Sequence, residues 1–256
     1  MKDTTHGKVF LIGAGPGDPD LLTVKALRLL QSADVVVFDR LVSAAILALI
    51  PDGVRQIDVG KAAGCHKLPQ VGINALLVQL AIEGACVVRL KGGDPLIFGR
   101  GSEEAAELAL AGVPFEYVPG ITSAQGAAAS TGVPLTHRGL ATSVRYVTGH
   151  RAKDAPLDLD WAGLAAPDCT LVVYMGALNA AEISAQLVAH GRSADTPAMA
   201  VAAATTPEEA HVVATLETLP GAIRAARLSA PILIVIGQVV SLYGAGRLPV
   251  AEALYA

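Results

Sequence analysis

The sequence predicts an α/β fold made of two α/β domains. From residue 8 to about residue 132, short apolar and β-branched runs alternate with longer amphipathic runs, and glycine-rich turns follow several of the short runs. Such alternation predicts a largely parallel sheet with helices on both faces. Residues 132–139 then interrupt the rhythm with a proline and a polar Thr-His-Arg run. We therefore expect an N-terminal domain of residues 1–137 and a C-terminal domain of residues 138–256.

In the first domain, each expected strand is a short β-branched run and each expected helix is a longer amphipathic run. The strands are expected at residues 9–12, 34–38, 55–59, 85–90 and 114–118. The helices are expected at residues 19–31, 43–50, 71–83, 102–111 and 122–130. Residues 62–70 are rich in glycine and polar side chains, so we expect a loop there.

In the second domain, the same reasoning gives fewer helices. The strands are expected at residues 143–148, 170–175, 198–203, 211–215 and 232–236, and the helices at residues 178–190 and 216–227. The strands near residues 200 and 213 follow each other closely, which predicts a mixed sheet.

Composition limits the classes of function. The net charge of -4 does not favour non-specific binding to nucleic acid. No apolar run approaches the roughly 20 residues that a membrane span requires, and the polar start of the chain does not resemble a signal peptide. The three cysteines, Cys65, Cys86 and Cys169, lie far apart and do not suggest a disulfide framework. We expect a cytoplasmic protein that binds neither membranes nor nucleic acid.

The strongest candidate for a ligand site lies between residues 87 and 104. A β-branched run ends at Lys91 and breaks into Gly92, Gly93 and Asp94. Glycines let a ligand lie against bare peptide groups, and the Asp94 carboxylate can accept hydrogen bonds from hydroxyl or ammonium groups. Strand, glycine turn and helix start in this order are typical of ligand sites in α/β proteins.

Charged side chains follow that turn. Arg100 stands between two glycines, and Glu103 and Glu104 fall in the first turn of the next expected helix. We expect the guanidinium group of Arg100 to form a cluster with these two carboxylates. For Glu104, favourable interaction with the helix dipole alone is the alternative.

Residues 13–18, GAGPGD, follow the first expected strand and partly match a dinucleotide-binding fingerprint. That fingerprint requires a third glycine where this chain has Asp18, and Pro16 lies within the turn. A nicotinamide or flavin site is therefore disfavoured. The loop either exposes its backbone beside a ligand or is simply a tight turn.

Together these motifs resemble the tetrapyrrole methylase family. The resemblance rests first on residues 91–95 (KGGDP) and 98–101 (FGRG). Further matching stretches occur in the family's order, at residues 13–19, 38–42, 59–61, 119–123, 134–138, 148–150 and 174–176. The match covers nearly the whole chain, from about residue 8 to residue 240.

The resemblance implies methyl transfer from S-adenosylmethionine to two ring carbons of uroporphyrinogen III, which gives precorrin-2 for sirohaem, cobalamin or haem d1. It also implies two α/β domains with the active site in the cleft between them, and a homodimer. Contacts with the methyl donor are implied for Pro16, Gly92, Gly93, Asp94, Ile97, Thr122, Ser123, Met175 and Ala204. At the last of these positions the family often has glycine, so only the backbone of Ala204 is expected to matter.

The resemblance also assigns the proton chemistry. Asp39 and Lys61, at the ends of the second and third expected strands, are similar to the family's proton acceptor and proton donor. A methylated ring carbon must lose a proton, and an acid and a base at neighbouring strand ends suit that task. A salt bridge between Asp39 and Lys61 is the alternative interpretation.

The substrate carries many carboxylates, which favours arginine because its planar fork pairs with them bidentately. The resemblance implies that Arg100, Glu103, Arg138 and Met175 contact the substrate, with Arg100 and Glu103 acting in catalysis. Further cationic candidates are Arg40, Arg89 and Lys91. The last two alternate with apolar residues on a strand, where one of them could simply face solvent.

Other classes of function fit less well. Cys65 and His66 lack a second spaced pair of ligands, so no metal site is expected. A later precorrin methyltransferase is the nearest alternative, followed by relatives that act on diphthine or ribosomal RNA. A nicotinamide-dependent oxidoreductase or a non-catalytic binding protein is less favoured. Some relatives carry a dehydrogenase and ferrochelatase module, which we do not expect here because the first strand begins near residue 9.

Overall fold

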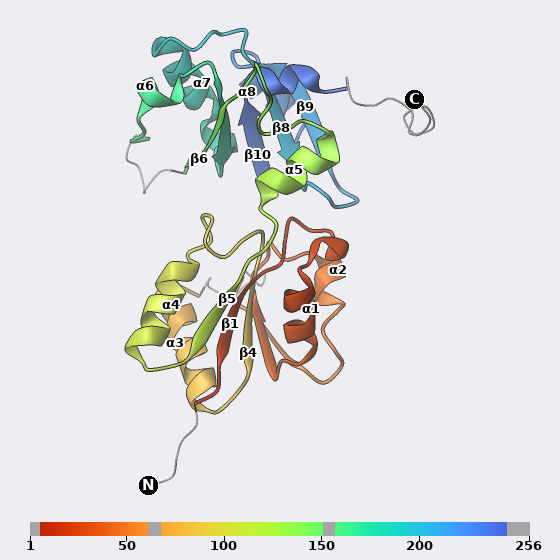
Figure 1. Cartoon of the computed structure of the whole chain (residues 1–256), viewed down its shortest axis with the longest axis vertical. Helices are drawn as coiled ribbons and strands as arrows, with labels where there is room; N and C mark the ends of the chain where they lie inside the picture. The colour runs from red at the N-terminus through yellow and green to blue at the C-terminus, as the bar shows by residue number, and fades with distance from the viewer. Residues whose placement is uncertain (1–5, 61–67, 151–156, 245–256) are drawn as a thin grey trace. The chain divides into compact units, whose positions relative to one another are not determined.

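The structure is a computed structural model that describes residues 6–60, 68–150 and 157–244. The chain forms two compact units, Met1–Thr122 and Ser123–Ala256; in Figure 1 the described part of the first runs from red to yellow-green and that of the second from green to blue. The division falls earlier than the expected one after residue 137. The reason is that α5 (Ser123–Thr131) packs Ala124 and Ala127 into a core with Met199 of the second unit. No helix in the described part of the chain is both long and apolar enough to cross a membrane.

The first unit contains a five-stranded sheet in the order β3-β2-β4-β1-β5. All of its neighbouring strands are parallel, as predicted. The strands are β1 (Val9–Gly13), β2 (Val35–Phe38), β3 (Arg55–Asp58), β4 (Val87–Lys91) and β5 (Phe115–Val118). Because β4 lies at the centre, all five of its residues are buried.

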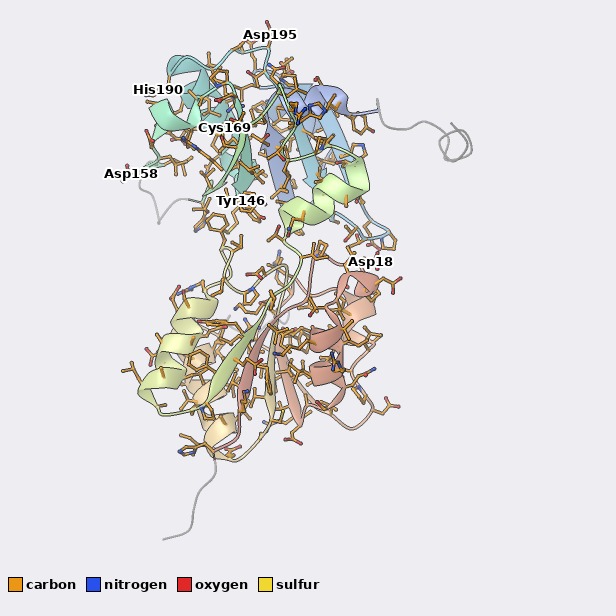
Figure 2. The ribbon with its side chains drawn as sticks, in the orientation of Figure 1. Asp18, Tyr146, Asp158, Cys169, His190 and Asp195 are labelled. Atoms are coloured by element: carbon orange, nitrogen blue, oxygen red, sulfur yellow. The ribbon has the colours of Figure 1, made fainter. Side chains whose placement is uncertain are left out.

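Helices cover both faces of this sheet. On one face, α3 (Gln70–Ile82) and α4 (Gly101–Leu110) pack against Val87 and its neighbours. On the other, α1 (Val24–Gln31) and α2 (Ala44–Leu47) pack against Val88 and Leu90. Alternate residues of β4 therefore point to opposite helical layers. Figure 2 shows the side chains that fill these layers.

The second unit contains a mixed sheet in the order β6-β7-β10-β8-β9, as the sequence predicts. Its strands are β6 (Ser143–Thr148), β7 (Cys169–Tyr174), β8 (Pro197–Ala202), β9 (Ala210–Thr215) and β10 (Ile232–Ile236). The central β10 is antiparallel to both β7 and β8, so those two strands run in the same direction. One face packs against α7 (Ala180–Ala189) and α8 (Leu219–Ala225), and the other packs against α5.

Four of the expected helices are shorter than predicted. The helix expected at residues 43–50 is observed only as α2 (Ala44–Leu47). The helix expected at residues 19–31 is a 3-10 turn, η1 (Pro19–Leu21), followed by α1, because Thr23 caps a new helix by accepting a hydrogen bond from the Ala26 amide. The helix expected at residues 178–190 similarly divides into η2 (Ala177–Asn179) and α7, and that at residues 216–227 begins only at α8. The short α6 (Trp161–Leu164) and η3 (Gln238–Leu242) were not predicted.

Candidate active site

The carboxyl edge of the first sheet gathers most of the expected site residues of this unit. Pro16 follows β1, Asp39 follows β2, residues 92–97 follow β4, and Thr122 follows β5. Since these strands are parallel neighbours, their carboxyl ends meet at one edge, which is where open α/β sheets bind ligands.

The glycine loops at this edge pack directly against one another. The Gly15 amide donates to the Gly93 carbonyl at 3.1 Å, and the Gly93 amide donates to the Gly15 carbonyl at 2.7 Å. A Cβ atom on Gly13 would lie 2.5 Å from both the Gly93 oxygen and the Gly120 nitrogen. The loops after β1, β4 and β5 thus approach so closely that glycine is required where they touch.

This packing changes the interpretation of Gly92 as a bare surface for a ligand. A Cβ atom on Gly92 would lie 2.7 Å from the Cβ atom of Leu41, in the loop after β2. The space beside this glycine is therefore filled by the protein itself. Gly93 differs, because its φ of +68° is in the left-handed region that favours glycine.

Asp94 ties two of these loops together. Its Oδ1 accepts a hydrogen bond from the Leu96 amide at 2.8 Å, and its Oδ2 accepts one from the Gly120 amide at 3.1 Å. The carboxylate is only partly buried, and each oxygen has a further lone pair. Asp94 can therefore accept a ligand's hydroxyl or ammonium group while it holds the loops.

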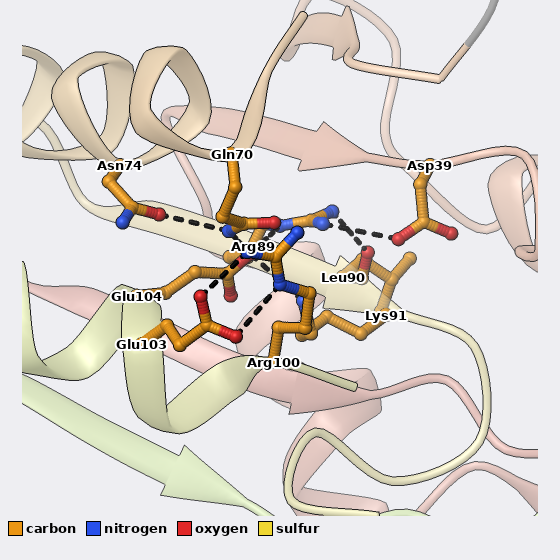
Figure 3. Close-up of polar contacts among 9 residues, drawn as sticks. All are labelled: Asp39, Gln70, Asn74, Arg89, Leu90, Lys91, Arg100, Glu103 and Glu104. Atoms are coloured by element: carbon orange, nitrogen blue, oxygen red, sulfur yellow. Dashed lines mark hydrogen bonds and ion pairs between the residues drawn. The ribbon is translucent and has the colours of Figure 1, made fainter. Parts of the chain in front are cut away.

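Beneath this edge lies a buried ion cluster, formed by Asp39, Arg89, Lys91 and Glu104 (Figure 3). Glu104 Oε1 accepts from Arg89 Nε at 3.1 Å and from Lys91 Nζ at 2.9 Å. Arg89 Nη2 lies 3.1 Å from Asp39 Oδ2, and its Nη1 donates to the Leu90 carbonyl. The side chains of Arg89, Lys91 and Glu104 are 3%, 5% and 0% exposed.

The cluster corrects the expectation that Arg89 or Lys91 faces solvent. Both are on the central strand, whose two faces are each covered by helices, so both side chains are buried. Burial is the main reason that the pKa of Lys91 is lowered, with a further contribution from Arg89, while Glu104 opposes the shift. Glu104 is thus more than a helix-start carboxylate.

The ion-pair partner of Asp39 among the described residues is Arg89. Lys61, which the sequence offers as the other half of an acid–base pair or salt bridge, lies outside the described residues, as do Cys65 and His66. Both interpretations of the Asp39–Lys61 pair therefore stay predictions.

Two polar residues of α3 extend the cluster and were missed in the sequence. Gln70 Nε2 donates to Glu104 Oε1 at 3.2 Å and to Asn74 Oδ1 at 2.9 Å. Glu104 Oε2 is buried and has no hydrogen-bond partner among the described residues. Helical spacing of Gln70 and Asn74 was the available signal, but which helix faces β4 follows only from the tertiary structure.

Arg100 and Glu103 form the expected pair at the start of α4. Arg100 Nε and Nη2 donate to the two Glu103 carboxylate oxygens at 2.8 and 2.7 Å. Hydrogen bonding between them raises the pKa of Arg100 and lowers that of Glu103. Both side chains are about half exposed, at 55% and 52%. Arg100 has a φ of +59°, in the left-handed region, which is a strained backbone conformation for a residue other than glycine.

In the second unit, Met175 follows β7 and Ala204 follows β8, whose carboxyl ends share an edge of the sheet. Met175 is exposed and has a φ of +54°, whereas Ala204 is buried between Ala203 and Thr205, which have φ values of +48° and +68°. Two sharp backbone turns therefore lie at this edge.

The remaining expected residues of this unit, Ser123 and Arg138, lie elsewhere in the topology. Ser123 is the first residue of α5. Arg138 is exposed in a turn before β6, held by pairing of His137 with Ala141, and has no ion-pair partner among the described residues. Arg138 precedes the amino end of β6, so strand order does not bring it to the carboxyl edge.

Comparisons with known proteins agree with this arrangement. Residues 8–220 match the family model described as Tetrapyrrole (Corrin/Porphyrin) Methylases. A uroporphyrinogen-III C-methyltransferase of Paracoccus denitrificans is 60% identical over 92% of this chain and 82% of its own length. A siroheme synthase of Azotobacter vinelandii is 56% identical over 92% of this chain, but the chain spans only 51% of that protein.

Solved structures give the same result. A uroporphyrin-III C-methyl transferase of Thermus thermophilus, complexed with S-adenyl homocysteine, is 42% identical with a TM-score of 0.79, over 92% of this chain and 94% of that one. A cobalt precorrin-4 methyltransferase is 33% identical with a TM-score of 0.82, over 94% and 98%. The fold predicted from the sequence is thereby confirmed. The chain belongs to the tetrapyrrole (corrin/porphyrin) methylase family.

Proposed function

We propose that this chain transfers methyl groups from S-adenosylmethionine to two ring carbons of uroporphyrinogen III and so forms precorrin-2. The observation that carries the proposal is the 60% identity, over 92% of the chain, to a protein named uroporphyrinogen-III C-methyltransferase. The precorrin-4 methyltransferase has a slightly higher TM-score but only 33% identity, and fold alone does not distinguish substrates.

The residues present suit the methyl donor. Asp94 has free lone pairs beside the glycine loops, and Ile97 exposes apolar surface after them. With Pro16, Gly92, Gly93, Thr122, Ser123, Met175 and Ala204, they form the proposed donor-binding set. When bound, S-adenosylmethionine supplies a methyl group that its sulfonium charge already activates.

The task of the protein is then orientation and proton removal. We assign Arg100 and Arg138 to substrate carboxylates, with Glu103 and Met175 beside the reacting pyrrole. As the carbon–methyl bond forms, the methyl–sulfur bond breaks and its electron pair stays on sulfur. Methyl transfer leaves the ring with one positive charge, so one proton must be lost overall for each methyl group. Asp39 accepts a proton from the methylated ring. Where Lys61 returns a proton as the double bonds rearrange, a second proton leaves the ring to solvent, and the product is neutral.

The test is incubation of the full chain with uroporphyrinogen III and S-adenosylmethionine labelled in the methyl group. Two labelled methyl groups per tetrapyrrole are expected. If S-adenosylhomocysteine binds but no label enters uroporphyrinogen III, the substrate assignment is wrong. Labelling of a later precorrin instead would identify the alternative substrate.

We also propose a cytoplasmic homodimer. The family resemblance supports the dimer, and the free thiols of Cys86 and Cys169 suit a reducing compartment. Light scattering coupled to size exclusion tests the assembly, and a monomeric mass would contradict it.

A further inference from the structure

We propose that Glu104 is a positioning residue for proton transfer: it fixes Arg89, and Arg89 in turn fixes the Asp39 carboxylate. This inference rests on the proposed role of Asp39 as proton acceptor. Glu104 itself is fully buried and therefore acts through Arg89.

The geometry of Arg89 carries the argument. One planar guanidinium group makes three separate contacts, from Nε to Glu104, from Nη1 to the Leu90 carbonyl and from Nη2 to Asp39. Since the nitrogens are fixed in one plane, anchoring Nε and Nη1 determines where Nη2 points. Figure 3 shows Arg89 between the Glu104 side and the Asp39 side of the cluster.

Asp39 is held but not enclosed. Its Oδ2 contacts Arg89 at 3.1 Å, and its Oδ1 accepts from the Leu41 amide at 3.1 Å. The side chain remains 25% exposed, whereas Arg89 is only 3% exposed. A carboxylate clamped by two donors, with an accessible side, has the orientation and the access that a general base requires.

Charge balance gives Glu104 its importance. Two cations, Arg89 and Lys91, are buried on the same side of β4, and Glu104 is the fully buried anion that contacts both. Removing its charge would leave two adjacent buried cations, which repel each other and move apart. Two nearby groups cannot replace this negative charge. The Gln70 amide of α3 is neutral. Burial, and secondarily Glu104, raises the pKa of Tyr117 in β5, which keeps its hydroxyl group neutral.

The experiment compares Glu104→Gln with Glu107→Gln in the full chain. Both substitutions neutralise a glutamate on α4, but Glu107 is exposed. We expect Glu104→Gln to lower kcat by about tenfold to 100-fold, the scale of a misplaced catalytic group, with the Kd for S-adenosylhomocysteine changed by less than about twofold. Glu107→Gln should leave both values unchanged.

Arg89→Lys is the second variant, in case Glu104→Gln does not fold. Lysine retains a positive charge beside Glu104. Its single ammonium nitrogen, however, cannot contact both Glu104 and Asp39, as the separate nitrogens of the planar guanidinium group do. A similar fall in kcat at an unchanged Kd is expected.

A double-mutant cycle separates positioning from general structural damage. If Glu104 acts through Asp39, Glu104→Gln should lower the residual rate of Asp39→Asn by less than about twofold, since the base is already lost. Three outcomes would overturn the inference. The losses of rate from Glu104→Gln and Asp39→Asn could be additive, both Glu104→Gln and Arg89→Lys could keep the wild-type kcat, or the Kd could rise together with the fall in kcat. A wild-type chain that does not methylate uroporphyrinogen III would refute the proposed function and this inference together, whereas additivity in an active enzyme refutes only the inference.

Discussion

The Oδ2 atom of Asp94 lies 3.1 Å from the amide nitrogen of Gly120 and accepts its hydrogen bond. This contact joins the loop after β4 to the loop after β5, the two strands that flank β1 in the sheet. A residue expected to touch the methyl donor is therefore also part of the scaffold. Variants at this position have to be tested for stability as well as for binding.

Replacing Asp94 with alanine should destabilise the first unit. The Leu96 and Gly120 amides would lose their acceptor, and bonds to a charged, partly exposed group are worth about 2 kcal/mol. Asp94→Asn retains one of the two accepting oxygens, so its free energy of unfolding should fall by about half as much. Urea unfolding measures this, with the exposed Asp52→Ala as a control; equal stability of Asp94→Ala and Asp52→Ala would contradict the tie between the loops.

The close approach of the glycine loops predicts a severe effect of Gly120→Ala. The new Cβ atom would collide with the Gly93 carbonyl and lie 2.7 Å from Gly13 Cα, which are backbone atoms that cannot rotate away. We expect a loss of about 3 kcal/mol or more. Gly221→Ala is the matched control, since that glycine has open space in α8 and should gain about 0.5–1 kcal/mol. Thermal unfolding of both variants decides the matter, and equal melting temperatures would refute the explanation.

Arg100→Ala should reduce turnover more than donor binding, because the Arg100 side chain is assigned to the tetrapyrrole. Arg100→Gly removes the same side chain but tolerates the φ of +59°, so it should be the more stable of the two. Initial rates with uroporphyrinogen III and calorimetric titration with S-adenosylhomocysteine separate the effects. Equal losses in rate and binding for both variants would argue against a substrate-side role.

Acid stability should depend on Glu116 of β5. Its hydrogen bonds from Lys25 and Lys8 lower the pKa of its carboxyl group from 4.5 to about 2. A lowered carboxyl pKa stabilises the folded state above the unfolded value, and the benefit disappears as the pH falls from about 4.5 to about 2. The difference in melting temperature between wild type and Glu116→Gln should therefore shrink across that window. High salt should also reduce it, because all three side chains are partly exposed. A difference independent of pH would exclude this ion pair as the cause.

Local patterns predicted most of the fold because they act over short distances. The β-branched runs gave the strands to within two residues, for example β6 and β10, and their close spacing near residue 200 predicted the mixed sheet. Glycine, proline and capping residues also act within a single turn of the chain. The start of the helix expected at residues 19–31 was nevertheless wrong, because Thr23 starts a new helix inside an amphipathic run.

By itself, the sequence determined the parallel sheet, the glycine loops at its carboxyl edge and the family, since each depends on residue type and order along the chain. Only the tertiary structure decided that β4 is central, and that fact buries Arg89 and Lys91 and turns Glu104 into their shared counter-ion. The partner of Asp39 followed from the same placement. Ion pairing depends on distance and burial, and these are set by which strands and helices pack together.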